Sequence, residues 1–107
     1  MTEETTIEKV TRDGMVAVLH TADYGAGWHT WGAPVQAVFD PEMVEAVLVN
    51  NHELAEEIAK RKYPDEYTGG VENLVVTWLP QNTAFRIAEY DGLERIEALN
   101  DTKFIVA

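Results

Sequence analysis

The chain has 107 residues, 46% of them hydrophobic, which suffices for one compact core, so we expect a single domain over residues 1–107. Nineteen acidic residues against eight basic ones give a formal net charge of −11, which disfavours direct binding to nucleic acid or to anionic lipid. The absence of cysteine excludes a disulfide framework, a thiolate nucleophile and a thiolate metal site in this chain.

The first predicted element is a β-hairpin. Its second strand is "GMVAVLHTA" at residues 14–22, an apolar segment rich in β-branched side chains that is typical of a buried strand. Asp13 and Gly14 form a turn signal at its start, so the opposing strand is expected to carry Ile7 and Val10. The loop "DYGAGWHTWG" at residues 23–32 follows directly and holds three glycines and three large aromatic residues.

Residues 35–40, "VQAVFD", predict a short strand after Pro34, and a helix is predicted to follow it. Asp40 is the expected N-cap of this helix, because a proline and an acidic residue come next and both suit a first turn. Four residues with helical spacing are predicted to form its apolar face: Met43, Val44, Val47 and Leu48.

A second helix is predicted from near residue 51 to Pro64. Asn50 and Glu53 have the spacing of a capping box, and the proline disfavours helical backbone at the residue before it. The inner face of this helix is predicted to consist of Leu54, Ala55, Ile58 and Ala59.

The last third of the chain changes to a period of two and predicts strands at residues 73–80, 83–90 and 93–99. An Asp-Gly pair between the second and third of these strands is a strong hairpin signal. A further edge strand is predicted at residues 103–107. The whole pattern predicts an α+β fold: an antiparallel β-sheet with two short helices inserted in the middle of the chain and packed on one face.

No constellation of residues supports a reaction, so we expect neither an enzyme nor a bound cofactor. His20, His29 and His52 are too far apart in sequence to form a local pair of metal ligands, and no metal site is predicted. The chain contains no serine, which excludes a serine nucleophile. The "GAG" segment at residues 25–27 lacks the third glycine and the following helix of a dinucleotide fingerprint, and no Walker lysine occurs.

The candidate binding site is the glycine and aromatic loop. Glycine lets a ligand approach the backbone closely, and tryptophan and tyrosine present flat faces that suit a planar ring. Arg86, in the predicted strand at residues 83–90, is a candidate for binding a phosphate or carboxylate group. The candidate ligand-binding residues are Tyr24, Gly25, Gly27, Trp28, His29, Trp31 and Arg86.

Structural alternatives remain open for these residues. Tryptophan beside glycine often fills the open end of a sheet, in which case Trp28 is the buried plug and Trp31 the more exposed ring. For Arg86, an ion pair with one of the nineteen acidic residues is favoured over a ligand contact.

A resemblance extends over most of the chain. The segment "VAVLHTADYGAGWHTW" at residues 16–31 is similar to a family of small phage and prophage proteins in which a VAVL-type strand leads into GYGAGW, a polar residue, threonine and tryptophan. "FDPEMVEAVL" and "FRIAEYDG" fit the same pattern, but serine is common at the position of His29 and asparagine at that of Gly32. The resemblance implies a non-enzymatic phage protein that acts against host defence in the host cytosol.

Two hypotheses from different classes follow. In the first, the protein sequesters a small planar, nucleotide-like ligand at the loop. In the second, its acidic surface occludes a basic, nucleic-acid-binding surface of a host protein, although acidic charge also simply keeps small proteins soluble. The sequence shows neither a membrane span nor the order of a signal peptide, so we expect a cytoplasmic location. The small core and short sheet edges favour a homo-oligomer.

Overall fold

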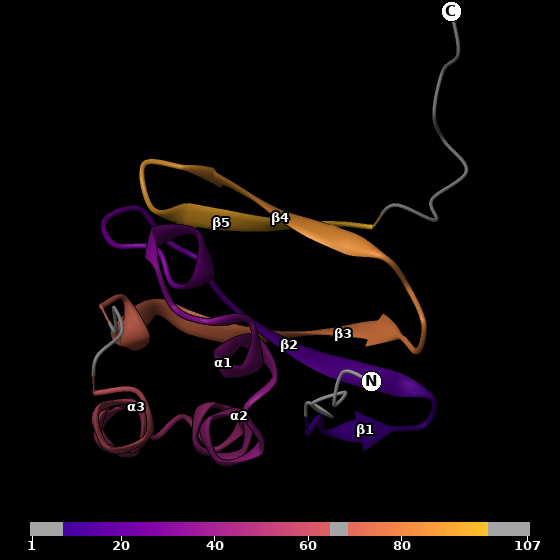
Figure 1. Ribbon diagram of the computed structural model, residues 1–107, viewed down its shortest axis with the longest axis horizontal. Helices are drawn as coiled ribbons and strands as arrows, with labels where there is room; N and C mark the ends of the chain where they lie inside the picture. Colours follow the sequence, from indigo (N-terminus) through magenta and orange to yellow (C-terminus); the bar gives the residue numbers. More distant parts are fainter. Residues whose placement is uncertain (1–7, 65–68, 99–107) are drawn as a thin grey trace, which may run out of the picture.

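The computed structural model describes residues 8–64 and 69–98, which form two antiparallel β-sheets and several short helices (Figure 1). The strands are β1 (Thr11–Arg12), β2 (Met15–Thr21), β3 (Leu74–Pro80), β4 (Phe85–Tyr90) and β5 (Leu93–Ala98). The helices are α1 (Val35–Phe39), α2 (Pro41–Leu48) and α3 (His52–Lys62), with the 3-10 helices η1 (His29–Trp31) and η2 (Val71–Asn73). The predicted α+β class, with helices packed against an antiparallel sheet, is confirmed.

Strands β2 and β3 form the middle layer of the molecule. In the view of Figure 1, helices α2 and α3 lie below this pair of strands and the β4–β5 hairpin lies above it. Side chains alternate along β2, so that Ala17 and Leu19 join the core against the helices and Val16 and Val18 join the core against the hairpin. Burial on both faces explains why β2 has a continuous apolar sequence.

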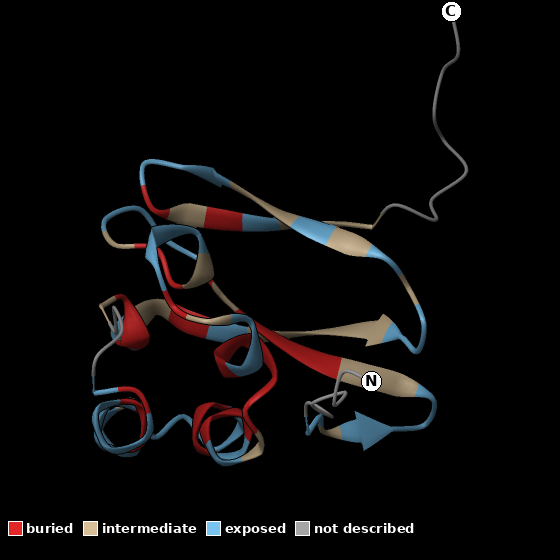
Figure 2. Cartoon of the chain, in the orientation of Figure 1, coloured by how far each residue is buried: buried red, intermediate tan, exposed pale blue. Residues whose placement is uncertain are grey.

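The larger hydrophobic core lies between the sheet and the helices. Figure 2 shows the buried residues gathered along β2 and on parts of all three α-helices. Leu19, Trp28, Met43, Val44 and Leu74 are each at most 1% exposed. Full burial of a side chain of this size contributes about 1.5–3 kcal/mol, so burial contributes more here than exposed ion pairs do.

A smaller core lies between the middle layer and the β4–β5 hairpin. Val38 and Phe39, from α1, are buried in it, and Phe85 and Ile87 of β4 pack against them. The rings of Phe39 and Phe85 meet edge to face, with centroids 6.2 Å apart and an interplanar angle of 82°. This ring pair connects α1 to the hairpin and forms part of the candidate site described below.

The two predicted helix caps differ in outcome. Asp40 caps α2 as predicted: its Oδ1 accepts hydrogen bonds from the backbone N–H groups of Glu42 and Met43 at 2.9 and 3.2 Å. For α3 the predicted cap was wrong by one residue. Asn51 caps it by accepting a hydrogen bond from the Leu54 N–H at 3.1 Å, whereas Asn50 has a φ of 60° in the connection after α2.

The strand predicted at residues 35–40 was wrong, because this segment forms helix α1. A hydrogen bond of 2.9 Å from the Ala37 N–H to the Pro34 carbonyl closes its first turn. The helical turn places Val38 and Phe39 together in the smaller core. Burial in this position outweighs the strand preference of valine and phenylalanine.

One residue in each predicted helix face was also misplaced. Leu48 and Leu54 are 38% and 41% exposed, although both were expected to face the core. Ala46 of α2, which was not expected there, is buried together with Ala55 of α3. The other six predicted residues are buried.

The prediction of a single sheet was also wrong in detail. A turn closed by the Thr83 N–H and the Pro80 carbonyl, at 3.2 Å, leads the chain from β3 to β4, and the two strands belong to different sheets. Strand β4 pairs instead with β5, with Tyr90 opposite Leu93, which confirms the predicted Asp-Gly hairpin. The sheet is therefore divided where the chain crosses to the second layer.

The first predicted hairpin is confirmed, but β1 has only two residues. Thr11 pairs with Val16 and Arg12 with Met15. Val10, which was predicted on the opposing strand, immediately precedes β1 and packs against the larger core. The prediction for Ile7, and that of a strand at residues 103–107, lie outside the described residues.

Candidate functional site

A buried carboxylate on β5 holds the glycine and aromatic loop in place. Glu94 is 2% exposed, and its Oε2 accepts hydrogen bonds from the Trp28 N–H at 2.9 Å, the Thr30 N–H at 2.8 Å and the Thr30 hydroxyl at 2.6 Å. Its Oε1 accepts a hydrogen bond from the Thr21 N–H at 3.0 Å. Charge-assisted hydrogen bonds of this kind are stronger than neutral ones, so the loop has a defined conformation rather than an open one.

The glycines of the loop are packed against other parts of the backbone. The Gly25 N–H donates a hydrogen bond to the Asp91 carbonyl at 2.9 Å, and a Cβ on Gly92 would collide with the Gly25 backbone. A Cβ on Gly27 would meet the Trp31 ring at 2.6 Å. Of the two glycines of the predicted site, Gly27 therefore allows a close contact within the protein. A Cβ on Gly25 would meet nothing within 4 Å, but this residue has a φ of 124°, which favours glycine.

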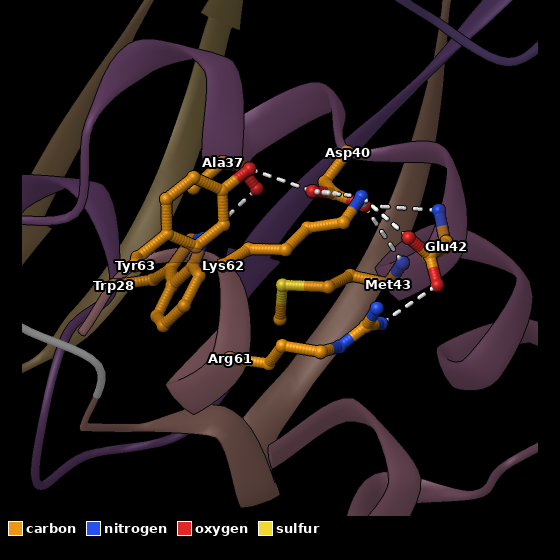
Figure 3. Close-up of polar contacts among 8 residues, drawn as sticks. All are labelled: Trp28, Ala37, Asp40, Glu42, Met43, Arg61, Lys62 and Tyr63. Carbon is orange, nitrogen blue, oxygen red and sulfur yellow. Dashed lines mark hydrogen bonds and ion pairs between the residues drawn. The ribbon is translucent and has the colours of Figure 1, made fainter. Parts of the chain in front are cut away.

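Trp28 is a buried plug, which was the structural alternative for this residue. Its side chain is 0% exposed, and the indole N–H donates a hydrogen bond of 3.2 Å to the Ala37 carbonyl in α1 (Figure 3). The ring belongs to the larger core. Trp28 therefore offers no surface to a ligand in this conformation.

The other two aromatic residues of the loop are exposed. Tyr24 is 57% exposed and meets the ring of Tyr90 edge to face at 6.4 Å. Trp31 is 45% exposed, and its indole N–H donates a hydrogen bond of 3.0 Å to Glu89. That hydrogen bond, with a second one from the Gly92 N–H, holds the pKa of Glu89 below its usual value.

His29 and Arg86 lie at one apolar hollow, although 57 positions separate them in the sequence. The hollow has a volume of about 270 Å³, and the rest of its lining is Val35, Val38, Phe39, Phe85 and Ile87. The hollow is thus formed by α1, β4 and the first residue of η1.

The polar groups of this hollow have defined orientations. Nδ1 of His29 lies 2.6 Å from the Ala33 carbonyl. Because a carbonyl oxygen can only accept, Nδ1 carries the proton, and in the neutral ring Nε2 is the acceptor. Arg86 donates from Nε to Glu97 at 2.7 Å, so the favoured ion pair does form. The side chain of Arg86 is 70% exposed, so this pair contributes little to stability.

A second hollow adjoins the first and has a volume of about 110 Å³. Phe39 and Phe85 belong to the lining of both hollows, so this ring pair is their common wall. Lys9, Asn82 and Thr83 provide the polar part of the second lining. No described aspartate or glutamate lines either hollow, although the chain has nineteen acidic residues.

Another polar cluster, at the start of α2, is a structural one (Figure 3). The Asp40 carboxylate is 3% exposed and accepts hydrogen bonds from the Tyr63 hydroxyl at 2.6 Å and from the Lys62 ammonium group at 3.2 Å, besides capping α2. Burial, and then the hydrogen bond to Asp40, raise the pKa of Tyr63 well above its usual range. All hydrogen-bonding capacity of Asp40 is used within the fold, and the cluster joins the end of α3 to the start of α2.

The histidines serve as hydrogen-bonding residues of the fold. His20 bonds to the Glu94 carbonyl at 3.1 Å and to the Thr77 hydroxyl at 2.6 Å, and His52 bonds to the Leu74 carbonyl at 3.0 Å. Within residues 8–64 and 69–98, no group of three or more His, Asp or Glu side chains has a geometry that would hold a metal ion.

Comparison of the chain with protein-family models, with curated proteins and with solved structures finds no match. None of the described helices is long and apolar enough to cross a bilayer. The functional proposal below is therefore based on the geometry of the site.

Several residues of the site were not identified from the sequence. The sequence pattern predicts strands at Phe39 and Phe85, and no motif includes Lys9. Their only sequence signal is apolar or basic character next to predicted elements, which many other residues share. Glu94 was one of nineteen acidic residues, and nothing in the local sequence distinguishes the buried one.

Proposed function

We propose that the protein is a non-enzymatic binding protein that sequesters a small planar, nucleotide-like ligand in the hollow beside His29 and Arg86. The observation that carries this proposal is the composition of the two linings. In a chain of net charge −11, the two adjoining hollows have aromatic and aliphatic walls, one histidine, one arginine and one lysine, and no described carboxylate. An apolar recess with a few cationic groups suits an aromatic ring that bears an anionic group.

The larger hollow is suited to a single ring system. Its volume of about 270 Å³ lies just below the range of roughly 300–1,000 Å³ that is usual for drug-sized ligands. A planar ring would pack against Phe85 and Val35, and a ring N–H or amino group would donate a hydrogen bond to Nε2 of His29. Arg86 would supply positive charge at the rim.

We propose binding rather than turnover because the larger hollow contains one candidate base, His29, with no acid or nucleophile among the described residues beside it. Together with the resemblance to phage proteins, this supports removal of a nucleotide-like signal of host defence in the host cytosol. The sequence hypothesis placed the ligand at the aromatic rings of the loop, of which Tyr24 and Trp31 are exposed. The position proposed here is instead the hollow of about 270 Å³ that His29 of the same loop lines.

Isothermal titration calorimetry with adenosine, guanosine, cytidine and uridine and their 5′-monophosphates tests this proposal. Val35 lines the hollow and is 50% exposed, so Val35→Glu should be tolerated by the fold and should weaken binding about tenfold or more by placing a carboxylate at the site. Val49→Glu makes the same charge change at a 70% exposed position outside both hollows and should leave binding unchanged. Absence of binding for the whole panel at millimolar concentration would overturn the proposal.

A second candidate function is occlusion of a basic surface of a host protein. A hollow of about 540 Å³ lies between α2 and α3, where the apolar residues Val49 and Leu54 are 70% and 41% exposed. Glu42, Glu45 and Arg61 belong to its lining, and the exposed residues Glu53 and Glu57 lie one residue before and three residues after Leu54 in α3. A groove between helices with an acidic border suits a partner segment that has an apolar anchor and basic neighbours.

A synthetic amphipathic peptide of leucine and lysine, followed by fluorescence polarisation, tests the second candidate. Binding that weakens with added salt and is lost in Leu54→Glu supports it, whereas salt-insensitive binding or an unaffected variant argues against it. Light scattering tests the expected homo-oligomer at the same surface. A dimer that Leu54→Glu dissociates would show that a second copy, and not a basic partner, occupies the groove.

A further inference from the structure

Lys9 lies at the wall of Phe39 and Phe85 that the two hollows share. Its Nζ lies 4.8 Å from the centroid of the Phe39 ring, a cation–π contact. Phe39 is 8% exposed and is held in turn by Phe85. Lys9 is exposed, and its ammonium group lies over a buried ring at the edge of the hollow.

Lys9 also differs from the other basic residues in its pairing. In the described ranges 8–64 and 69–98, every other lysine and arginine forms an ion pair with an aspartate or a glutamate, at distances of 2.7–3.5 Å. Lys9 forms none with a described residue, in a chain with more than twice as many acidic as basic residues. A cation with no carboxylate partner among the described residues, beside a hollow that no described carboxylate lines, is a natural position for an anionic group of a ligand.

Two further residues that line the same hollow as Lys9 add groups that can donate hydrogen bonds to an anion. Asn82 and Thr83 line the same hollow of about 110 Å³ and contribute an amide and a hydroxyl. Asn82 has a φ of 67°, in the turn that leads from β3 to β4. An ammonium group, an amide N–H and a hydroxyl can all donate to a phosphate oxygen. The volume suits a compact tetrahedral anion better than a second aromatic ring.

We propose that Lys9, with Asn82 and Thr83, is the phosphate-binding part of the ligand site, so that the ligand is a nucleoside monophosphate. Its base lies in the hollow of His29 and Arg86, and its phosphate reaches across the Phe39–Phe85 wall to Lys9. This inference rests on the proposed function, since it assigns the ligand class of the same site.

The test compares each nucleoside with its 5′-monophosphate by isothermal titration calorimetry. In the wild-type protein the monophosphate should bind about tenfold more tightly than the nucleoside, and the difference should shrink as salt increases. In Lys9→Gln the two should bind about equally, while the affinity for the nucleoside stays unchanged. Lys60→Gln makes the same charge change at an exposed residue of α3 that lines none of these hollows, and it should keep the wild-type difference.

The possible outcomes separate the two proposals. If the monophosphate binds no more tightly than the nucleoside, the assignment of Lys9 is overturned and the proposed function stays intact. The same holds if the higher affinity of the monophosphate survives in Lys9→Gln. If the higher affinity of the monophosphate is lost in Arg86→Gln and kept in Lys9→Gln, the phosphate binds at the other end of the site. This result would also overturn the assignment of Lys9. Displacement of the monophosphate by inorganic phosphate alone, with no preference for the nucleoside part, would contradict both.

Discussion

The side chain of Glu94 and the backbone of Trp28 are joined by a hydrogen bond of 2.9 Å across 66 residues of sequence. The same carboxylate oxygen binds the N–H and the hydroxyl of Thr30. A strand at the end of the described chain thereby determines the shape of a loop near its beginning. The loop is a preorganised structure, and its conformation depends on one buried charge.

Glu94→Gln should lower the free energy of unfolding by about 2 kcal/mol. The substitution keeps the size of the side chain but replaces one acceptor oxygen with an N–H₂ group that faces backbone donors, and it removes the charge that strengthens the remaining hydrogen bonds. Urea denaturation measures the change. Glu57→Gln, at an exposed position, is the matched control and should change stability by less than about 0.5 kcal/mol. Equal stability of the two variants would show that the carboxylate does not stabilise the loop.

Gly92→Ala should destabilise the protein by at least about 1 kcal/mol more than Gly14→Ala. Both glycines follow an aspartate in a two-residue hairpin turn with positive φ, at 88° and 77°, so the conformational cost of alanine is about the same in both. A Cβ at Gly14 meets nothing within 4 Å, whereas one at Gly92 would collide with the backbone of Gly25. Thermal unfolding of the two variants measures the difference, and equal losses would contradict the close packing of loop and hairpin.

Tyr63→Phe should lower stability by about 1–2 kcal/mol at neutral pH, because Asp40 loses one buried hydrogen bond. The wild-type protein should also lose stability as the pH rises above the ordinary tyrosine value of 10.0. The folded-state pKa of Tyr63 is raised, so the unfolded chain ionises first and the contribution of the phenol declines with increasing pH.

Urea denaturation from about pH 8 to about pH 11 measures this effect. The difference in stability between wild type and Tyr63→Phe should narrow across the alkaline part of this range. A constant difference would argue that the hydroxyl does not stay protonated in the folded protein. Tyr24→Phe, at an exposed ring, is the control and should not alter the alkaline slope.

Glu89→Gln should remove an acid transition from the fluorescence of Trp31. The hydrogen bonds from Trp31 and Gly92 lower the pKa of Glu89 below its usual value of 4.5. The contact with the indole is therefore complete at pH values above 4.5 and is lost as the pH falls through the lower folded-state pKa. The difference between the emission of wild type and Trp31→Phe isolates this ring from the other tryptophans. A transition in Glu89→Gln with the same midpoint would assign the signal to another group.

Local sequence patterns were sufficient for much of the fold. The Asp-Gly turns, the Asp40 cap and the strand segments β3 and β4 depend on neighbouring residues, and each was predicted correctly or nearly so. The segment at residues 35–39 was predicted as a strand because its side chains favour one. It is helical, and the helical turn buries Val38 and Phe39 together in the smaller core, which outweighs their strand preference.

The candidate site was predicted less completely. The loop itself stood out, and Trp28 and Trp31 have the buried and exposed positions that the structural alternative assigned to them. The hollow could not be predicted, because it arises where α1 crosses β4 and depends on the division of the strands into two sheets. Lys9 is notable only when the pairing of the other described lysines and arginines is known.

The sequence by itself determined an acidic chain with antiparallel strands and short helices, together with the loop that carries its glycines and tryptophans. These properties follow from composition, periodicity and turn chemistry, which act over a few residues. Only the tertiary structure decided that Glu94 is buried under the loop, that Trp28 is buried, and that His29 and Arg86 line the same hollow. The reason is physical: burial and charge pairing depend on which distant segments pack together, and one carboxylate among nineteen has no local feature that sets it apart.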